Sequence, residues 1–296
     1  VATSQPPRAS DDPQVQQHYA AQMALSAALV AQLRALWPSL QPLTPENIGR
    51  LTDALQILLG PFSEAAIGLA TDHYETMRAD AGITSPLRIV RTELPPRSKI
   101  EASVAWATAP LADIRRRQEA DLAEIENEIL ARGEAKLQKM LADEARAQMV
   151  AAVDDDDQAL GFARIARPDA CAFCLTLAFR TSGRGTGEER HYGVYKSRKT
   201  AGATPVGSAE VNRYHTNCHC QVQPIFETGF MPAQHILDAQ EFYSESTAGS
   251  KKGQLLKDFR RALDAQRGGR KVALPEMTPT PIVTPDNAEI MRTLLD

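Results

Sequence analysis

The chain of 296 residues is long enough for one large domain or for a few smaller ones. Its formal net charge of -4 and pI near 5.9 argue against a protein that coats nucleic acid through overall positive charge. Aromatic residues make up only 5% of the chain, so a core would consist mostly of Ala, Leu, Ile and Val, which favours helices over a β-sandwich.

The N-terminal stretch gives no sign of export or membrane insertion. Residues 1–13 are polar and Pro-rich, so we expect them to be disordered, and they lack the charged and then apolar pattern of a secretory signal. Apolar runs along the chain stay short of the ~20 residues that cross a bilayer, so no membrane span is expected. A reducing cytosol follows as the expected compartment, where clustered cysteines more often bind metal than form disulfides.

A helical domain is expected over residues 14–109. The stretch Gln14–Trp37 is rich in Ala, Leu and Gln, with Asp12 placed to cap it and Pro38 to end it. A weaker helical segment covers Lys99–Ala107, after a Pro-Pro break. The N-terminal region therefore predicts helices packed on helices.

Two further helices are expected between these segments. Thr44 is placed as an N-cap with Pro45 at the first helical position, and Gly60 is placed as the C-cap of that helix. The next helix is expected to run from Pro61 to Ala81, where Gly82 stops it.

A long helix is predicted over residues 110–153, where apolar residues recur mostly at steps of three and four among charged ones. At a rise of about 1.5 Å per residue it would extend roughly 60 Å and give the protein an elongated architecture. Such a helix could be a strut that packs on a partner. It could equally lie along its own domain, with a kink near Gly133, and the spacing leaves both interpretations open.

The composition changes after this helix. The acidic run Asp154–Asp157 is interpreted as a solvated turn rather than a cation site, because adjacent side chains point in different directions. Residues 154–232 then combine three β-like runs, one at the start of "ALGFARIARPDACAFC" and the other two "HYGVYKS" and "CQVQPIF", with a polar Gly/Arg/Thr-rich loop. Helices are expected again over 233–270, followed by an extended Pro/Thr-rich tail over 271–296 that could order against a partner.

All four cysteines lie in two clusters within this small α+β module. Cys171 and Cys174 form a C-x2-C pair, and Cys218 and Cys220 form a C-x-C pair that His215 precedes by three residues. A structural zinc ion needs four such soft ligands in a closed tetrahedron. These five residues can supply them, and which four bind stays open. Because the module looks too small and polar to fold by core burial, metal binding would supply folding free energy. The predicted fold is thus mainly α with a zinc-stapled α+β module.

Other interpretations of the cysteines and histidines are less favoured. The cysteines could be buried thiols or two disulfides, whereas a redox pair would need a βαβ pattern that is missing. A catalytic zinc is disfavoured because an all-protein shell leaves no position for substrate. His18, His73 and His235 fall in helical patterns and are interpreted as surface or satisfied polar groups, and His191 as structural.

Read together, "GFARIARPDACAFCLTLAFR", "VYKS" and "YHTNCHCQVQPIF" resemble the C-terminal zinc module of MuF-like minor head proteins of tailed bacteriophages, in their actinobacterial-phage form. The resemblance covers residues 160–226. It implies a minor capsid, head-morphogenesis protein of the virion, present in the host cytoplasm during assembly. The implied partners are the portal, other head proteins and packaged DNA, and the implied role is assembly, genome packaging or delivery. No nucleophile elbow, H-E-x-x-H motif or phosphate loop is found, so no enzyme is expected.

Two alternatives remain in different functional classes. The first is an HNH-like metal-dependent nuclease, with His191, His215 and Asn217 as candidate active-site residues. The second is a nucleic-acid-binding zinc module without catalysis, whose basic loop would meet phosphates. The candidate contacts in that loop are Arg184, Arg190, Lys196, Arg198 and Lys199.

Overall fold

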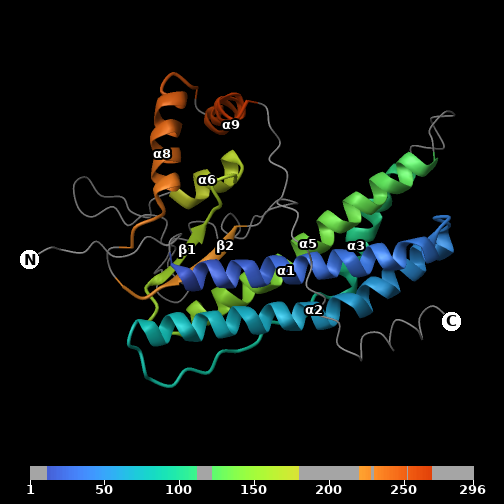
Figure 1. Cartoon of the computed structure of the whole chain (residues 1–296), viewed down its shortest axis with the longest axis horizontal. Helices are drawn as coiled ribbons and strands as arrows, with labels where there is room; N and C mark the ends of the chain where they lie inside the picture. Colours follow the sequence, from blue (N-terminus) through green and yellow to red (C-terminus); the bar gives the residue numbers. More distant parts are fainter. Residues whose placement is uncertain (1–11, 112–121, 180–219, 228–229, 252, 269–296) are drawn as a thin grey trace, which may run out of the picture.

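The computed structural model describes residues 12–111, 122–179, 220–227, 230–251 and 253–268 (Figure 1). In this part of the chain, long helices lie side by side in an elongated bundle (Figure 1). A two-stranded sheet with shorter helices packs at one end of the bundle. The predicted class, mainly α with a small mixed region, is confirmed for these residues.

Helix α1 spans Pro13–Leu36 and begins where the sequence predicts. The side chain of Asp12 accepts a hydrogen bond from the Gln14 backbone N–H at 2.8 Å, and proline fills the first turn. The chain then tightens into the short 3-10 helix η1, Trp37–Leu40. The face of α1 that points into the bundle repeats every three or four residues, through Leu25, Leu29, Leu33 and Leu36.

Helix α2 is a single helix, Pro45–Asp80, capped by Thr44, whose hydroxyl accepts from the Asn47 N–H at 3.2 Å. The predicted break at Gly60 is wrong, because the helix continues through Gly60 and Pro61. An interior proline costs about 3 kcal/mol. That cost is offset here by a continuous buried stripe on both sides of it, formed by Leu55, Leu58, Leu59, Phe62 and Ala66.

The other end of α2 agrees with the prediction. The helix stops at Asp80, and Gly82 follows with a φ of 73°, a left-handed conformation that glycine adopts without strain. The Gly82 N–H donates to the Ala79 carbonyl, so the turn satisfies a carbonyl at the helix end.

Helices α3, Arg97–Thr108, and α5, Leu122–Asp155, complete the bundle. Helix α5 lies against α1, α2 and α3, and also reaches the sheet (Figure 1). Of the two interpretations of the long helix, the structure supports the one in which it lies along its own domain. Residues 112–121 of the predicted segment lie outside the described residues.

An extended connection, Ile83–Pro96, runs from α2 to α3 across the bundle. The fully buried side chain of Gln148, on α5, binds the middle of this connection. The Thr92 N–H donates to Gln148 Oε1 at 2.8 Å, and Gln148 Nε2 donates to the Val90 carbonyl at 3.2 Å. One amide thus supplies the donor and the acceptor that a neighbouring strand would otherwise supply.

Strands β1, Gly161–Ile165, and β2, Gln221–Ile225, pair in antiparallel fashion with Gly161 opposite Ile225. Both were expected as β-like runs. The third such run, residues 191–197, lies outside the described residues. Helix α6, Ala172–Phe179, follows β1 after a short turn.

Helices α8, Gln234–Thr247, and α9, Leu255–Gln266, confirm the helices expected over 233–270 (Figure 1). They pack with α6 around Phe259, which is fully buried. Its ring centroid lies 5.1 Å from that of Tyr243 and 6.3 Å from that of Phe179, both edge-on. Edge-to-face aromatic contacts of this kind stabilise a small core beyond their buried area. The tail over 271–296 and residues 1–11 lie outside the described residues.

The small region has a larger core than the sequence suggests. One cluster of buried side chains runs without interruption from the bundle into it and includes Phe162, Leu175 and Val222. The expectation that this module is too polar to be held by core burial is therefore wrong for its described part. Burial against α5 and around Phe259 already supplies a hydrophobic driving force there.

The acidic run Asp154–Asp157, whose first two residues are the last of α5, is also only partly solvated. Asp156 is buried, and its carboxylate accepts hydrogen bonds from Arg78 Nε at 2.8 Å and from the Tyr74 hydroxyl at 3.0 Å. The adjacent Asp157 is exposed. The Asp156 carboxylate is thus part of the bundle, and the solvated-turn interpretation fails for it.

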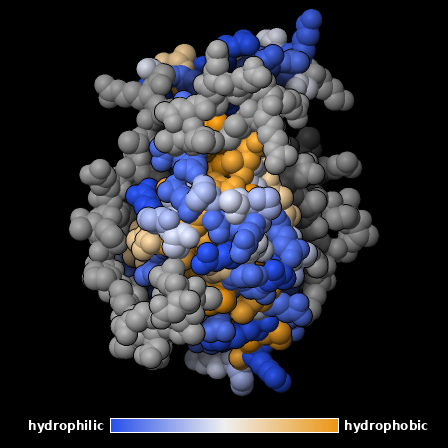
Figure 2. Space-filling model, turned by 90° about the vertical axis from the view of Figure 1, so that its right-hand side faces the viewer, coloured by the Kyte–Doolittle hydropathy of each residue, from blue (hydrophilic) through white to orange (hydrophobic). Residues whose placement is uncertain are grey.

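Two segments, Pro13–Leu40 and Pro45–Asp80, are long and apolar enough to cross a membrane by length and composition alone. The expectation of short apolar runs overlooked both of them. Half of each apolar window is buried inside the bundle, as in core helices. In an end view of the bundle, hydrophobic residues lie between hydrophilic ones rather than forming a uniform apolar surface (Figure 2).

Candidate metal centre

The strand pairing places the two described parts of the cysteine constellation at one end of the sheet. Ile165, the last residue of β1, pairs with Gln221, the first residue of β2. Cys220 therefore enters β2 beside the point where the chain leaves β1 towards Cys171 and Cys174. We call this region, residues 166–174 together with Cys220, the cysteine end.

Cys171 and Cys174 lie at the start of helix α6. Cys171 directly precedes the helix, and its carbonyl accepts from the Leu175 N–H at 3.0 Å. Cys174 lies in the first turn. Unsatisfied N–H groups at a helix start favour negative charge, so this position suits a thiolate. The C-x2-C spacing thus has a helical origin, whereas the sequence interpretation placed it in a tight turn.

The three described cysteines are largely buried. Cys174 is 1% exposed and Cys220 is 2% exposed, and both belong to the hydrophobic cluster that links the bundle to the small region. Cys171 is partly buried against the same cluster. Thiols in such surroundings suit a structural role better than a reactive one.

Side chains from three separate segments hold the backbone of the cysteine end. His235 Nε2 lies 2.7 Å from the Ala166 carbonyl oxygen. The guanidinium of Arg267 donates to the Pro168 carbonyl at 2.9 Å and to the Ala170 carbonyl at 3.0 Å. Arg146, on α5, donates to the Cys220 carbonyl. The turn before Cys171 and the residue before β2 are therefore both fixed by tertiary contacts.

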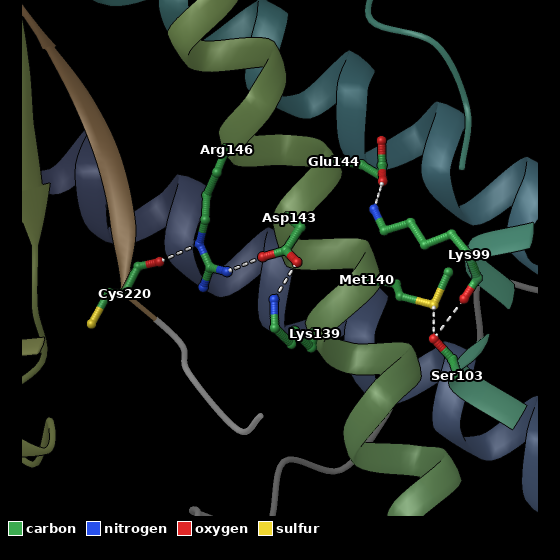
Figure 3. Close-up of polar contacts among 8 residues, drawn as sticks. All are labelled: Lys99, Ser103, Lys139, Met140, Asp143, Glu144, Arg146 and Cys220. Carbon is green, nitrogen blue, oxygen red and sulfur yellow. Dashed lines mark hydrogen bonds and ion pairs between the residues drawn. The ribbon is translucent and has the colours of Figure 1, made fainter. Parts of the chain in front are cut away.

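Arg146 makes the most buried of these contacts. It is 3% exposed, its Nε lies 2.9 Å from the Cys220 carbonyl oxygen, and its Nη1 lies 3.1 Å from Asp143 Oδ1. Asp143 also pairs with Lys139 one turn earlier (Figure 3). Figure 3 shows the Cys220 carbonyl directed at α5 and its sulfur directed away from the helix.

Helix α1 also reaches this region. The guanidinium carbon of Arg167 lies 5.6 Å from the ring centroid of Tyr19, a cation–π contact. Burial raises the pKa of the Tyr19 phenol, against the opposing effect of Arg167. Tyr19 therefore remains a neutral, packed aromatic, and the cysteine end is joined to the bundle through α1 as well as α5.

The described residues do not complete a metal shell. Among the residues that the structure describes, no group of three or more His, Cys, Asp or Glu side chains gathers in a way that could hold a metal ion. Of the predicted ligands, His215 and Cys218 lie outside those residues. So do His191, Asn217 and the basic candidates Arg184, Arg190, Lys196, Arg198 and Lys199.

Sequence reasoning missed the positions that hold the cysteine end. Arg146 lies three residues before Met149 and seven before Val153, both buried, so its place in the apolar stripe of the long helix was a usable signal. His235 is a satisfied polar group, as expected. Nothing local marks Arg267, since its carbonyl partners lie far back in the chain.

His18 and His73 are buried rather than on the surface. Their rings stack between α1 and α2 with centroids 4.2 Å apart and an interplanar angle of 6°. Burial lowers the pKa of His18 to about 3 and that of His73 to about 4. Both are therefore neutral near pH 7 and stabilise the helix pair as packed rings, outside the cysteine end.

Comparison with known proteins assigns a family to the chain. The family model described as VG15 protein matches residues 9–246, which include the bundle, the sheet, both cysteine pairs and nearly all of α8. Comparisons with curated proteins and with solved structures give no match. The match spans most of the chain and joins the bundle and the cysteine end in one unit. The chain therefore belongs to the VG15 protein family and is a bacteriophage protein.

Proposed function

We propose that this phage protein is a non-enzymatic minor component of the head. It would associate with the portal or the head interior and assist assembly, genome packaging or delivery. In this role the helical bundle is a rigid body, and the cysteine end presents a fixed docking unit to other head proteins. The protein would act in the host cytoplasm during assembly and remain in the virion.

The observation that carries this proposal is the way the cysteine end is built. Its backbone is fixed by side chains that come from α5, α8 and the end of α9, and two of its cysteines are almost fully buried. Such construction supports a rigid binding unit rather than an open catalytic cleft. The MuF-like pattern of the same residues and the family assignment support a place in the phage head.

A structural zinc ion is part of the proposal. The donors are soft thiols, and Cys171 and Cys174 lie at a helix start that favours thiolate. Since no three of the described residues gather as ligands, Cys218 and His215 would both be needed to complete a shell of four with two of the described cysteines. The ion would join the start of α6 to the chain just before β2.

The decisive experiment for the head role is mass spectrometry of purified particles. DNA-filled virions, empty heads and tails are separated, and the copy number of this chain is measured relative to the portal protein. We expect a low-copy component in both kinds of head. Complete loss of the chain from particles, with normal yields after its gene is deleted, would contradict the proposal.

Two assays test the metal and the nuclease alternative separately. Elemental analysis of the purified protein should find one zinc per chain, and Cys174→Ser should reduce that content, while Ser103→Ala on α3 should leave it unchanged. A plasmid-nicking assay with magnesium or manganese should show no cleavage above a buffer control. Metal-dependent cleavage that purifies with the protein would favour the HNH-like alternative instead.

A further inference from the structure

We infer that Arg146 is a positioning residue that fixes the direction of the Cys220 thiol. Its Nε–H holds the Cys220 carbonyl at 2.9 Å, immediately before β2 begins. A residue at the start of a strand has its side chain oriented by the backbone around it. With the carbonyl held towards α5, the sulfur points away from the helix (Figure 3).

The form of the contact explains why an arginine occupies this position. The guanidinium is a planar fork, so Nε can serve the carbonyl while Nη1 serves Asp143 Oδ1 at 3.1 Å. Asp143 in turn pairs with Lys139. Asp143, on the same helix, therefore fixes the orientation of the guanidinium. A lysine ammonium at this position could not make both bonds in the same fixed geometry.

Burial makes the contact matter energetically. The Arg146 side chain is only 2% exposed, so its bond to the carbonyl does not compete with bulk water. The opposite face of the same stretch of α5 is tied to α3, because Lys99 Nζ lies 2.8 Å from Glu144 Oε1 (Figure 3). Helix α5 is thus held on both sides where it meets Cys220, and it orients that residue relative to the whole bundle.

The consequence for the proposed zinc site is that Arg146 would pre-orient one ligand without touching the metal. This consequence rests on the proposed function. The anchoring of Cys220 does not, because it depends only on contacts among described residues. The two ideas can therefore fail separately.

The test compares the alkylation rates of Cys220 and Cys174 in the intact protein, with each site assigned by peptide mass spectrometry. Loss of a hydrogen bond to a charged group should raise the Cys220 rate by about tenfold or more in Arg146→Met. Cys174 lies on α6, whereas the carbonyl that Arg146 binds directly precedes β2, so the Cys174 rate should stay near the wild-type value. Global unfolding would expose both cysteines together, so Cys174 is an internal control.

Three further variants sharpen the result. Arg146→Lys should behave like Arg146→Met if the fork geometry matters, and Asp143→Asn should raise the Cys220 rate to a smaller extent. Arg132→Met removes a cation elsewhere on α5 and should change neither rate. Equal acceleration of both cysteines in Arg146→Met, or no acceleration of Cys220, would overturn the inference. If the isolated protein contains zinc, its release to a chelator should also be faster in Arg146→Met.

Discussion

Arg78 and Asp156 form a buried ion pair that joins the end of α2 to the end of α5. The Nε of Arg78 lies 2.8 Å from Asp156 Oδ2, and the two side chains are 9% and 3% exposed. The same guanidinium donates to the carbonyl and the hydroxyl of Ser85, and Tyr74 donates to the same carboxylate oxygen. The pair therefore organises two helix ends and the start of the connection to α3.

Asp156→Asn should destabilise the protein strongly. Removing one partner leaves the guanidinium of Arg78 buried without its counter-charge, which typically costs about 3–5 kcal/mol. Urea unfolding followed by circular dichroism measures the loss. The matched control is Asp157→Asn, one residue further on and exposed, which should change stability by less than about 0.5 kcal/mol. Equal effects of the two variants would contradict a special role for Asp156.

Stability should fall as the pH drops from about 6.5 towards 4, because of His18 and His73. Their pKa values are lowered to about 3 and about 4 by burial, against 6.5 for an ordinary histidine. In this window the unfolded chain binds protons that the folded protein does not. The free energy of unfolding therefore decreases by about 1.4 kcal/mol per pH unit for each of them. Above pH 6.5 both are neutral in both states, and their contribution stays constant.

Urea titrations at pH 7.5 and pH 5.0 check this dependence. The double variant His18→Gln/His73→Gln should be less stable than wild type at pH 7.5, because a stacked, buried ring pair is lost. Its further loss on acidification should be clearly smaller than that of wild type. An unchanged difference between the two pH values would show that other groups cause the acid sensitivity.

Pro61→Ala should stabilise the protein. Pro61 is exposed in the interior of α2, so alanine removes no buried contact and restores an N–H that can bond to the carbonyl one turn earlier. The gain should be as large as about 3 kcal/mol, the difference between the two residues in a helix interior. Thermal unfolding measures it. Pro45→Ala, at the first turn where proline fits, should instead be neutral or slightly destabilising.

Phe259→Ala should weaken the small core shared by α6, α8 and α9. The ring is fully buried and touches the rings of Phe179, Phe242 and Tyr243, so its removal should cost about 3–5 kcal/mol. Leu255→Ala, on the same helix but 37% exposed, should cost less than about 1 kcal/mol. Hydrogen exchange should locate the added opening in α8 and α9. An increase spread evenly over α1 and α2 would contradict a local core.

Local signals predicted the helix starts well. The side chains of Asp12 and Thr44 each accept a hydrogen bond from an N–H within the next three residues, so a few adjacent residues determine where each helix begins. The break at Gly60 failed because packing along α2 outweighs a local preference against helix. The burial of Asp156 could not be predicted from neighbouring residues either, since its partner Arg78 lies far away in the sequence.

In the candidate site, too, the local features were predictable from the sequence and the long-range contacts were not. Cys171, Cys174 and Cys220 stand out in the sequence because cysteine is rare there, and the β-like runs before and after them correctly mark β1 and β2. What fixes them could not be predicted from spacing. Arg146 and Arg267 donate to backbone carbonyls, and a carbonyl is present at every residue, so the sequence does not identify which one is bound.

The two hydrogen bonds of Gln148 determine where the connection between α2 and α3 can tolerate inserted residues. They fix Val90 and Thr92 by a single side chain, while Arg78 binds Ser85 near the start of the connection and Leu87 and Ile89 pack against the core. An insertion next to Leu94, between Thr92 and the start of α3, would lengthen the connection on one side without moving the fixed midpoint. A residue inserted between Val90 and Thr92 would separate the donor from the acceptor, so natural variants should keep that spacing and vary around it.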